Sequence, residues 1–439
     1  MLGLVCAWGG VACGSFQYDD FANILNDSAT TDFTALADRL SGGIRPLTRL
    51  SYAICARLLG EWAGGWLLVQ LFVHALTVLG VARLAQLRTG NTTAAVIAAA
   101  CFAFLPSHAT IIAYASGRST GFATALLIGA LLSHELAGRS GRTPLYTALA
   151  ILLFLLACAA KEIAIVFPAL VLLWEATRPT THPTGVPIRE CLLRAAPYAI
   201  CAIGTAILLL ACVPRYRQLL EFSLAYRSPL ESLAHNLAAL PATLSLGLRP
   251  WALSIEHVAA AGPLQIAIGA TTLFLMVLAA ARLRARQPLV TLALLWPLIA
   301  LLPTHSMIAK LDPVTEGPLY LALAGPAIAF GGYAQDWLRH PRFTSPIRSA
   351  MATALLAAIG LCMWRTYVWN DPVRLWQEAV VHAPASSRAW TNLGMAHFAA
   401  NRYAPAQRAF RTALALDPAN TRVMFNLELV AALNTHPSE

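Results

Sequence analysis

Apolar runs that are long enough, or nearly long enough, to cross a lipid bilayer recur along most of this chain. A membrane-spanning helix needs roughly 17 to 25 mostly apolar residues. Runs near that length occur at about 1–16, 66–84, 93–106, 119–136, 145–160, 163–177, 195–213, 263–281, 289–303, 318–334 and 349–366. Because 58% of the 439 residues are hydrophobic and only 12% are charged, composition also indicates a chain that lies in lipid. We predict an all-α fold whose residues 1–366 form a polytopic transmembrane domain of about 11 spans.

The basic residues are distributed as membrane topology requires. The formal net charge is +10, and all but two of the 31 basic side chains are arginines. They cluster between alternate apolar runs, at Arg83 and Arg88; Arg139 and Arg142; Arg178, Arg189 and Arg194; Arg282, Arg284 and Arg286; and Arg339, Arg342 and Arg348. The positive-inside rule makes that side cytoplasmic, and the N-terminus with it. Because no nucleic-acid motif accompanies the charge, we expect no nucleic-acid partner.

The opening run is expected to stay in the protein as a first span. It has no basic segment before it and no small-residue cleavage site, which a signal peptide would need. The nine cysteines lack CxxC or metal-ligand spacing. We interpret them as small buried apolar residues, and we predict neither disulfides nor a metal centre.

The opposite face collects ionisable groups. They are Asp19, Asp20, Arg45, His108, Arg118, Lys161, Glu162, Lys310, Asp312 and Glu316, and they include the only two lysines of the chain. Ionisable residues at membrane depth are costly and are a functional hypothesis by default. A carboxylate can act as general base towards a hydroxyl, and nearby cations can hold a phosphate leaving group. The alternative for each residue is structural: a solvated turn at the acidic pair, a snorkelling Arg118, a local ion pair at Lys161-Glu162, or an interfacial His108.

Residues 367–439 follow a different pattern. With Trp390 as position 4 of a tetratricopeptide unit of about 34 residues, the signature positions are occupied by Leu393, Gly394, Ala406, Phe410, Ala413 and Pro418. A half unit precedes this complete unit and one helix follows it. Because about three repeats are needed for independent stability, we expect this module to lean on the membrane domain or on a partner. Such modules bind proteins and are not catalytic themselves.

Several segments of the membrane domain occur in a recognisable order. They are Tyr18-Asp19-Asp20 with Ile24 and Asn26; Arg45-Pro46-Leu47-Thr48 followed by His74; Pro106-Ser107-His108 through Gly117-Arg118; Ala160-Lys161-Glu162 with Pro168 and Trp174-Glu175; and Pro303-Thr304 with Glu316 and Leu319-Tyr320-Leu321. In this order, and with repeats at the end, the chain resembles the transmembrane and tetratricopeptide-repeat O-mannosyltransferases of the GT-C glycosyltransferase class and their bacterial relatives. The resemblance covers essentially the full length.

Three positions depart from that family. Leu105 stands where the family has a histidine, Thr110 where it has a glutamate, and Gly317 where an arginine usually follows the late glutamate. The first two departures weaken any metal or acid–base role for that loop. The third removes a phosphate ligand, so donor binding would depend more on Lys161, Lys310 and Arg118.

The resemblance implies a transferase that inverts the anomeric carbon and uses a polyprenyl-phosphate sugar as donor. Asp19 would be the base that activates a Ser or Thr hydroxyl, with Asp20 as its positioning partner. The residues implied to bind the donor phosphate or sugar are Arg45, His108, Arg118, Lys161, Glu162, Lys310 and Glu316. No cofactor is required, although a divalent metal stays open. The protein would lie in a bacterial inner membrane, with its repeats in the periplasm recruiting an exported acceptor such as a pilin or another protein partner.

A second hypothesis comes from a different class of protein. The membrane helices would anchor a non-catalytic repeat scaffold for assembly of a secreted or envelope complex. The acidic pair, together with Arg45, Lys161 and Glu316, separates the two hypotheses, because a scaffold has no need of these residues. A transporter is disfavoured, since no pair of glycine-interrupted spans recurs in the two halves.

Overall fold

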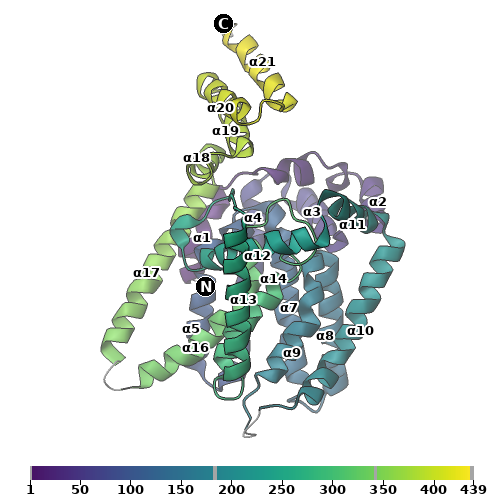
Figure 1. Ribbon diagram of the computed structural model, residues 1–439, viewed down its shortest axis with the longest axis vertical. Coiled ribbons are helices and arrows are strands. Elements are labelled where there is room, and N and C mark those ends of the chain that lie inside the picture. The colour runs from purple at the N-terminus through teal and green to yellow at the C-terminus, as the bar shows by residue number, and fades with distance from the viewer. Residues whose placement is uncertain (1, 181–184, 341–343, 436–439) are drawn as a thin grey trace.

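The computed structural model describes residues 2–180, 185–340 and 344–435, and these residues form helices and loops without any β-strand (Figure 1). Arg342, one of the arginines predicted to be cytoplasmic, lies outside the described residues. The main helices of the membrane domain are α4 (Ala63–Thr89), α5 (Thr92–Ala103), α7 (Arg118–Ala137), α8 (Thr143–Ala160), α9 (Phe167–Ala176), α10 (Ile188–Cys212), α13 (Pro263–Leu283), α14 (Pro288–Leu301), α16 (Ala324–Arg339) and α17 (Thr344–Trp369). The all-α prediction is confirmed for the described residues.

Within the described residues, six helices are long and apolar enough to cross a membrane, and a bent pair makes a seventh if it counts as one span. The six are Ala63–Thr89, Ala115–Ala137, Thr143–Ala160, Ile188–Cys212, Pro263–Leu283 and Ser345–Trp369. This number is smaller than the predicted 11. The prediction counted apolar composition, which does not detect a break in a helix.

Besides the run 93–106, which forms the bent pair, four of the predicted spans are broken or short. The run 1–16 forms α1 (Leu2–Trp8) and a 3-10 helix (Gly9–Cys13), and the run 163–177 begins as a 3-10 turn (Glu162–Val166) before α9. The run 318–334 divides between α15 (Leu319–Ala322) and α16, and the run 289–303 gives a helix of 14 residues, α14. A helix rises about 1.5 Å per residue, so helices this short do not cross a bilayer unaided.

Local sequence explains the helix ends. Helix α4 ends where Gly90 adopts the left-handed conformation (φ 67°), which glycine takes without steric cost. Helix α5 starts because the Asn91 side chain accepts hydrogen bonds from the first free backbone N–H groups. After α5, Pro106 opens a 3-10 turn that leads into α6 (Ala109–Ile112), and the chain bends by 56°. Proline lacks an N–H donor and holds Leu105 in an extended conformation, so it breaks this span.

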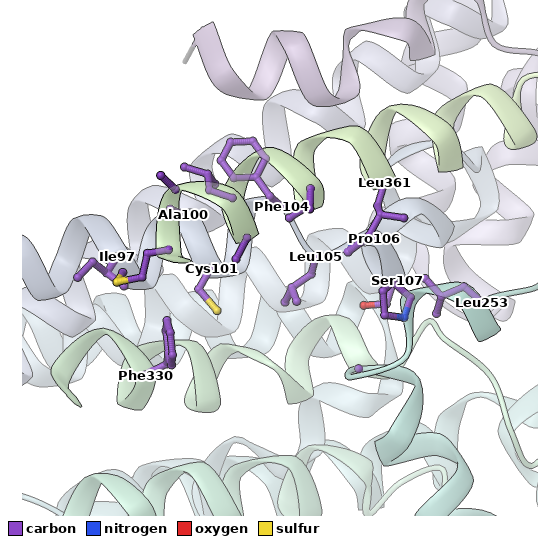
Figure 2. A pocket seen from close by; sticks show the side chains of 18 of the residues that line it. Ile97, Ala100, Cys101, Phe104, Leu105, Pro106, Ser107, Leu253, Phe330 and Leu361 are labelled. Carbon is purple, nitrogen blue, oxygen red and sulfur yellow. The ribbon is translucent and has the colours of Figure 1, made fainter. Parts of the chain in front are cut away.

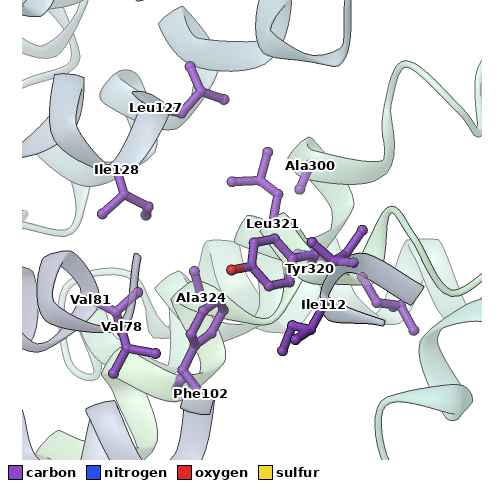
Figure 3. Close-up of a cluster of buried hydrophobic side chains, with 14 of the residues drawn as sticks. Val78, Val81, Phe102, Ile112, Leu127, Ile128, Ala300, Tyr320, Leu321 and Ala324 are labelled. Carbon is purple, nitrogen blue, oxygen red and sulfur yellow. The ribbon is translucent and has the colours of Figure 1, made fainter. Parts of the chain in front are cut away.

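Helices from both halves of the membrane domain pack around one apolar core (Figure 3). This core joins Val78 of α4, Phe102 of α5 and Leu127 of α7 to Tyr320 of α15, all of which are almost fully buried. Helices α5 and α16 approach so closely that a side chain at Gly331 would collide with the α5 backbone. Small residues at such crossings are typical of membrane helices.

The arginine-rich segments meet at one end of the domain, as predicted. Arg139 donates to the carbonyl of Leu87 at 2.8 Å, and Arg88 donates to the carbonyl of Trp174 at 2.8 Å. Arg286, after α13, lines the same cavity as Arg88. The side of the membrane that this end faces stays a prediction.

The other end carries the repeats and the loops that we predict to be outer loops (Figure 1). Shorter helices cover it, among them α2 (Phe33–Gly42), α3 (Pro46–Leu59), α11 (Pro214–Tyr226) and α12 (Pro229–Leu246). Helix α17 runs along the edge of the domain and leads directly into the repeat module, which consists of α18 (Pro372–His382), α19 (Ser387–Ala399), α20 (Tyr403–Leu416) and α21 (Thr421–Thr435).

The repeat module is a pair of packed helices with a half unit on each side. Phe410 of α20 is fully buried, and any side chain at Gly394 would collide with its ring, which explains both signature residues. The first helix, α18, packs its Trp376 edge-on against Tyr18 of the membrane domain, with ring centroids 5.4 Å apart. The prediction that the short array leans on the membrane domain is therefore confirmed.

Candidate functional site

A cavity of about 500 Å³ opens at the repeat end of the membrane domain. Its walls come from the first outer loop, the turn before α7, the connection between α8 and α9, and the loop after α14. Six of the nine predicted site residues line it: Asp19, Arg45, Lys161, Glu162, Lys310 and Glu316. Segments separated by up to about 300 residues thus converge on one polar space.

The two aspartates take different positions. Asp20 is fully buried and accepts hydrogen bonds from the backbone N–H of Gln17 (3.0 Å) and from the N–H and hydroxyl of Ser116 (2.7 and 2.6 Å). Burial raises its pKa to about 6. Asp20 therefore ties the first outer loop to the turn that leads into α7.

Asp19 is exposed and lines the cavity. Tyr18, the residue before it, has a left-handed backbone (φ 40°), which is uncommon for a residue with a side chain. This conformation forms the turn that precedes Asp19. Partial burial by the surrounding loops raises the pKa of Asp19 above its usual value, although a hydrogen bond with Tyr114 and the charge of Arg388 act in the opposite direction. Of the acidic pair, only Asp19 lines the cavity.

Arg45 and Lys161 form the cationic wall beside Glu162. The Arg45 guanidinium donates two hydrogen bonds to the Glu162 carboxylate. Nε donates to Oε2 at 2.9 Å, and Nη2 donates to Oε1. Burial alone would raise the pKa of Glu162, but Arg45 reverses this effect and lowers it to about 2. The Lys161 ammonium donates to the hydroxyl of Thr120 at 2.7 Å, and burial together with Arg45 lowers its pKa to about 7.

Lys310 and Glu316 lie on the loop that closes the cavity from the side of α14. Lys310 donates to the Thr315 hydroxyl at 2.7 Å, and burial lowers its pKa to about 8. Glu316 is buried and accepts from the backbone N–H of Ser254 at 2.6 Å and faces His257 at 3.4 Å. The second oxygen of the Glu316 carboxylate has no partner within the described residues.

Arg118 and His108 are not in the cavity. Arg118 is fully buried and donates to the carbonyl of Trp66 (3.0 Å) and to the sulfur of Cys55 (3.1 Å). The rings of Tyr52 and Trp66 lie 5.3 and 5.0 Å from its guanidinium carbon. These contacts make Arg118 a buried packing cation outside the cavity lining, since both of its terminal nitrogens already have partners.

His108 packs in the apolar core. Its ring centroid lies 4.6 Å from those of both Phe102 and Tyr320, and the side chain is fully buried. Its predicted role in donor binding therefore has no geometric support in this conformation.

Sequence reasoning missed the polar partners of the site. Ser116, Thr120, Thr315 and Ser254 supply hydrogen bonds to the charged residues, but single Ser and Thr side chains carry no spacing signal. It also missed Arg388 of α19, which binds Asp312 in the cavity wall. No pattern distinguishes this arginine from other polar residues of the repeat.

A second cavity, of about 640 Å³, lies between α5, α16 and α17 and is almost wholly apolar (Figure 2). Ala100, Cys101 and Phe330 line its walls. It reaches Leu253, whose neighbour Ser254 lines the polar cavity. Two consecutive residues thus line different cavities, Leu253 the apolar one and Ser254 the polar one.

The described residues contain no group of three or more His, Cys, Asp or Glu side chains arranged to hold a metal ion.

Comparison with known proteins identifies the repeat module. The tetratricopeptide repeat family matches residues 387–420, the same 34 residues that the sequence pattern predicted as the complete unit. No curated protein and no solved structure matches this chain. The chain is therefore an all-helical protein with candidate membrane helices and a tetratricopeptide module, which is a class of module that binds other proteins.

Proposed function

We propose that this protein is a membrane glycosyltransferase that moves a sugar from a polyprenyl-phosphate donor to a Ser or Thr hydroxyl of an exported protein. The observation that carries the proposal is the composition of the polar cavity. It combines Asp19, which forms no ion pair within the described residues, with Arg45, Lys161 and Lys310, whereas the lining carboxylates Glu162 and Asp312 are paired with arginines. A transferase of this kind needs a base for the acceptor and cations for the phosphate that leaves.

The reaction assigns each group a role. The acceptor oxygen attacks the anomeric carbon while Asp19 takes its proton. The bond between that carbon and the phosphate oxygen breaks, its electron pair stays on that oxygen, and the polyprenyl phosphate departs. Lys161 and Lys310 balance the charge that develops there. The raised pKa of Asp19 favours this role, because a general base works best when its pKa approaches the operating pH.

The apolar cavity supports the choice of a lipid-linked donor. A polyprenyl phosphate has a charged head joined to a long hydrocarbon chain, and the protein offers one polar and one apolar cavity that are lined by the consecutive residues Ser254 and Leu253. Burying hydrocarbon is worth about 0.8 kcal/mol per methylene group. A soluble nucleotide sugar would make no use of this second space.

The test compares intact masses of exported proteins from cells with the native chain, with no chain, and with Asp19→Asn, Asp20→Asn or both. Losing a general base lowers transfer by about 10² to 10⁴-fold, so Asp19→Asn should abolish the mass increment. Asp20→Asn should reduce it less, because Asp20 acts through the loop. Asp38→Asn, on the exposed face of α2, is the matched control.

Two results count against the proposal. Undiminished transfer in both single variants and in the double variant would refute the mechanism. No mass change in any exported protein when the chain is deleted would favour the scaffold hypothesis, which the tetratricopeptide match also accommodates.

A further inference from the structure

One arginine of the repeat module joins two loops of the membrane domain. Arg388, near the start of α19, donates from both terminal nitrogens to the Asp312 carboxylate, at 3.0 and 2.6 Å. Its Nε donates to Glu256 at 2.9 Å. The neighbouring Ser386 hydroxyl donates to the other oxygen of Glu256 at 2.7 Å. A fork that holds two carboxylates in fixed geometry is a contact that lysine cannot reproduce.

Both carboxylates belong to loops that build the polar cavity. Asp312 lines the cavity and lies two residues after Lys310. Glu256 lies two residues after Ser254, whose N–H holds Glu316 at 2.6 Å. Without the Arg388 cation, Asp312 and Glu256 would lie close together with no opposite charge between them, and both loops would lose a fixed anchor.

The repeat module also contacts the loop of the proposed base. Trp376 of α18 packs on Tyr18, next to Asp19. Burial raises the pKa of both Tyr18 and Asp19, and the charge of Arg388 opposes that rise. Arg388 therefore acts on two sides of the cavity, although it is not one of the residues that line it.

We propose that Arg388 is a positioning residue of this site, which holds the loop 304–318 so that Lys310 and Glu316 face Asp19. The repeat module is then a structural part of the site as well as a surface for partners. The positioning of Lys310 is independent of the reaction, whereas the effect on transfer rests on the proposed function.

The chain offers a direct readout, because Lys161 and Lys310 are its only lysines and both line the cavity. The charged or titratable groups around Lys310 are Asp312 and His305 on its own loop, Glu316 further along that loop, and Lys161 across the cavity. In the native chain Arg388 pairs with the Asp312 carboxylate. Its removal frees Asp312 to stabilise the ammonium and admits water, and both effects raise the pKa of Lys310.

The experiment measures the pH profile of amine acylation in the full-length protein in detergent, with each lysine followed by peptide mass spectrometry. In Arg388→Gln the labelling midpoint of Lys310 should rise from about 8 towards 10.5. Labelling below the midpoint should slow about tenfold for every pH unit by which the midpoint rises. The midpoint of Lys161 should stay near 7. Arg411→Gln, on the exposed face of α20, is the control and should change neither lysine.

Arg388→Lys provides the second variant, since it keeps the charge but loses the fork. Its labelling midpoint for Lys310 should lie between those of the native chain and Arg388→Gln. If Arg388→Gln does not fold, Arg388→Lys tests the positioning role of Arg388. An unchanged Lys310 profile in a folded Arg388 variant overturns the proposal. If the native protein transfers sugar, Arg388→Gln should also lower kcat/KM while Arg411→Gln does not. If it transfers none, the proposed function fails and the labelling still decides the role of Arg388.

Discussion

We predict that the buried ammonium of Lys161 makes the proposed transfer sensitive to pH. Burial, reinforced by Arg45, lowers the pKa of Lys161 to about 7, compared with an ordinary value of 10.5. The protonated form is the one that holds a phosphate, and it is lost as pH rises through this pKa. At pH 8 about one Lys161 in ten is protonated. We therefore predict that kcat/KM for the donor falls about tenfold per pH unit above 7, and more steeply above about 8, where Lys310 also loses its proton.

Replacing Lys161 separates its charge from its position. Lys161→Arg keeps a cation at every pH in this range, so its profile should stay flat until Lys310 titrates near 8. Lys161→Met should lose donor binding at all pH values but raise the melting temperature. The native fold buries Lys161 where its charged form is disfavoured, whereas the unfolded chain leaves it in water. Burial of this ammonium therefore costs folding free energy at neutral pH, and methionine removes that cost.

The assay is initial-rate transfer from a polyprenyl-phosphate sugar between pH 5.5 and 9.5 in detergent, with melting temperatures measured in parallel. Thr120→Val is the matched control, since it removes the hydroxyl that accepts from Lys161 but leaves the cation. The reasoning is refuted if Lys161→Arg and the native chain share the same alkaline limb. It is also refuted if acylation of Lys161 has its midpoint above pH 9.

Three further predictions concern packing and the apolar cavity. Arg118→Met should lower stability by about 1 to 3 kcal/mol, because it removes the hydrogen bonds of a buried cation to Trp66 and Cys55, while KM for the proposed donor stays unchanged; a raised KM would return Arg118 to the site. Phe410→Ala should destabilise the repeat by about 3 to 5 kcal/mol, seen as faster hydrogen exchange in α19 and α20 with α7 unaffected; equal loosening of both would contradict separate cores. Ala100→Trp should fill the apolar cavity and raise KM about tenfold for a long-chain donor, the equivalent of about two buried methylene groups. A short-chain donor should be unaffected, and an equal effect on both would remove the cavity from the donor site.

Some of these features were predictable because they depend on the composition and the spacing of residues along the chain. Helical content follows from long apolar runs, and the clustering of arginines at one end follows from their alternation between those runs. The tetratricopeptide unit 387–420 depends on residue identity at fixed spacing, so a single sequence was sufficient to predict its boundaries. The convergence of Asp19, Lys161 and Lys310 on one cavity was also anticipated, since alternating topology places their loops on the same face.

Other features depend on contacts between residues far apart in the chain. Hydropathy predicted about 11 spans, but proline breaks and short helices that pack on their neighbours leave six or seven candidates within the described residues. Asp20 and Arg118 carry the same charges as Asp19 and Arg45, yet each is buried with its own partners.

The sequence by itself therefore determined the helical class, the repeat unit and the face on which the charged residues gather, because these depend on composition and spacing. Only the tertiary structure decided which charged side chains line the cavity and which are buried outside its lining. It also decided that Arg388 of the repeat joins the loop of Lys310, since that contact spans 76 residues. The direction and the partner of a side chain follow from packing, which no local pattern encodes.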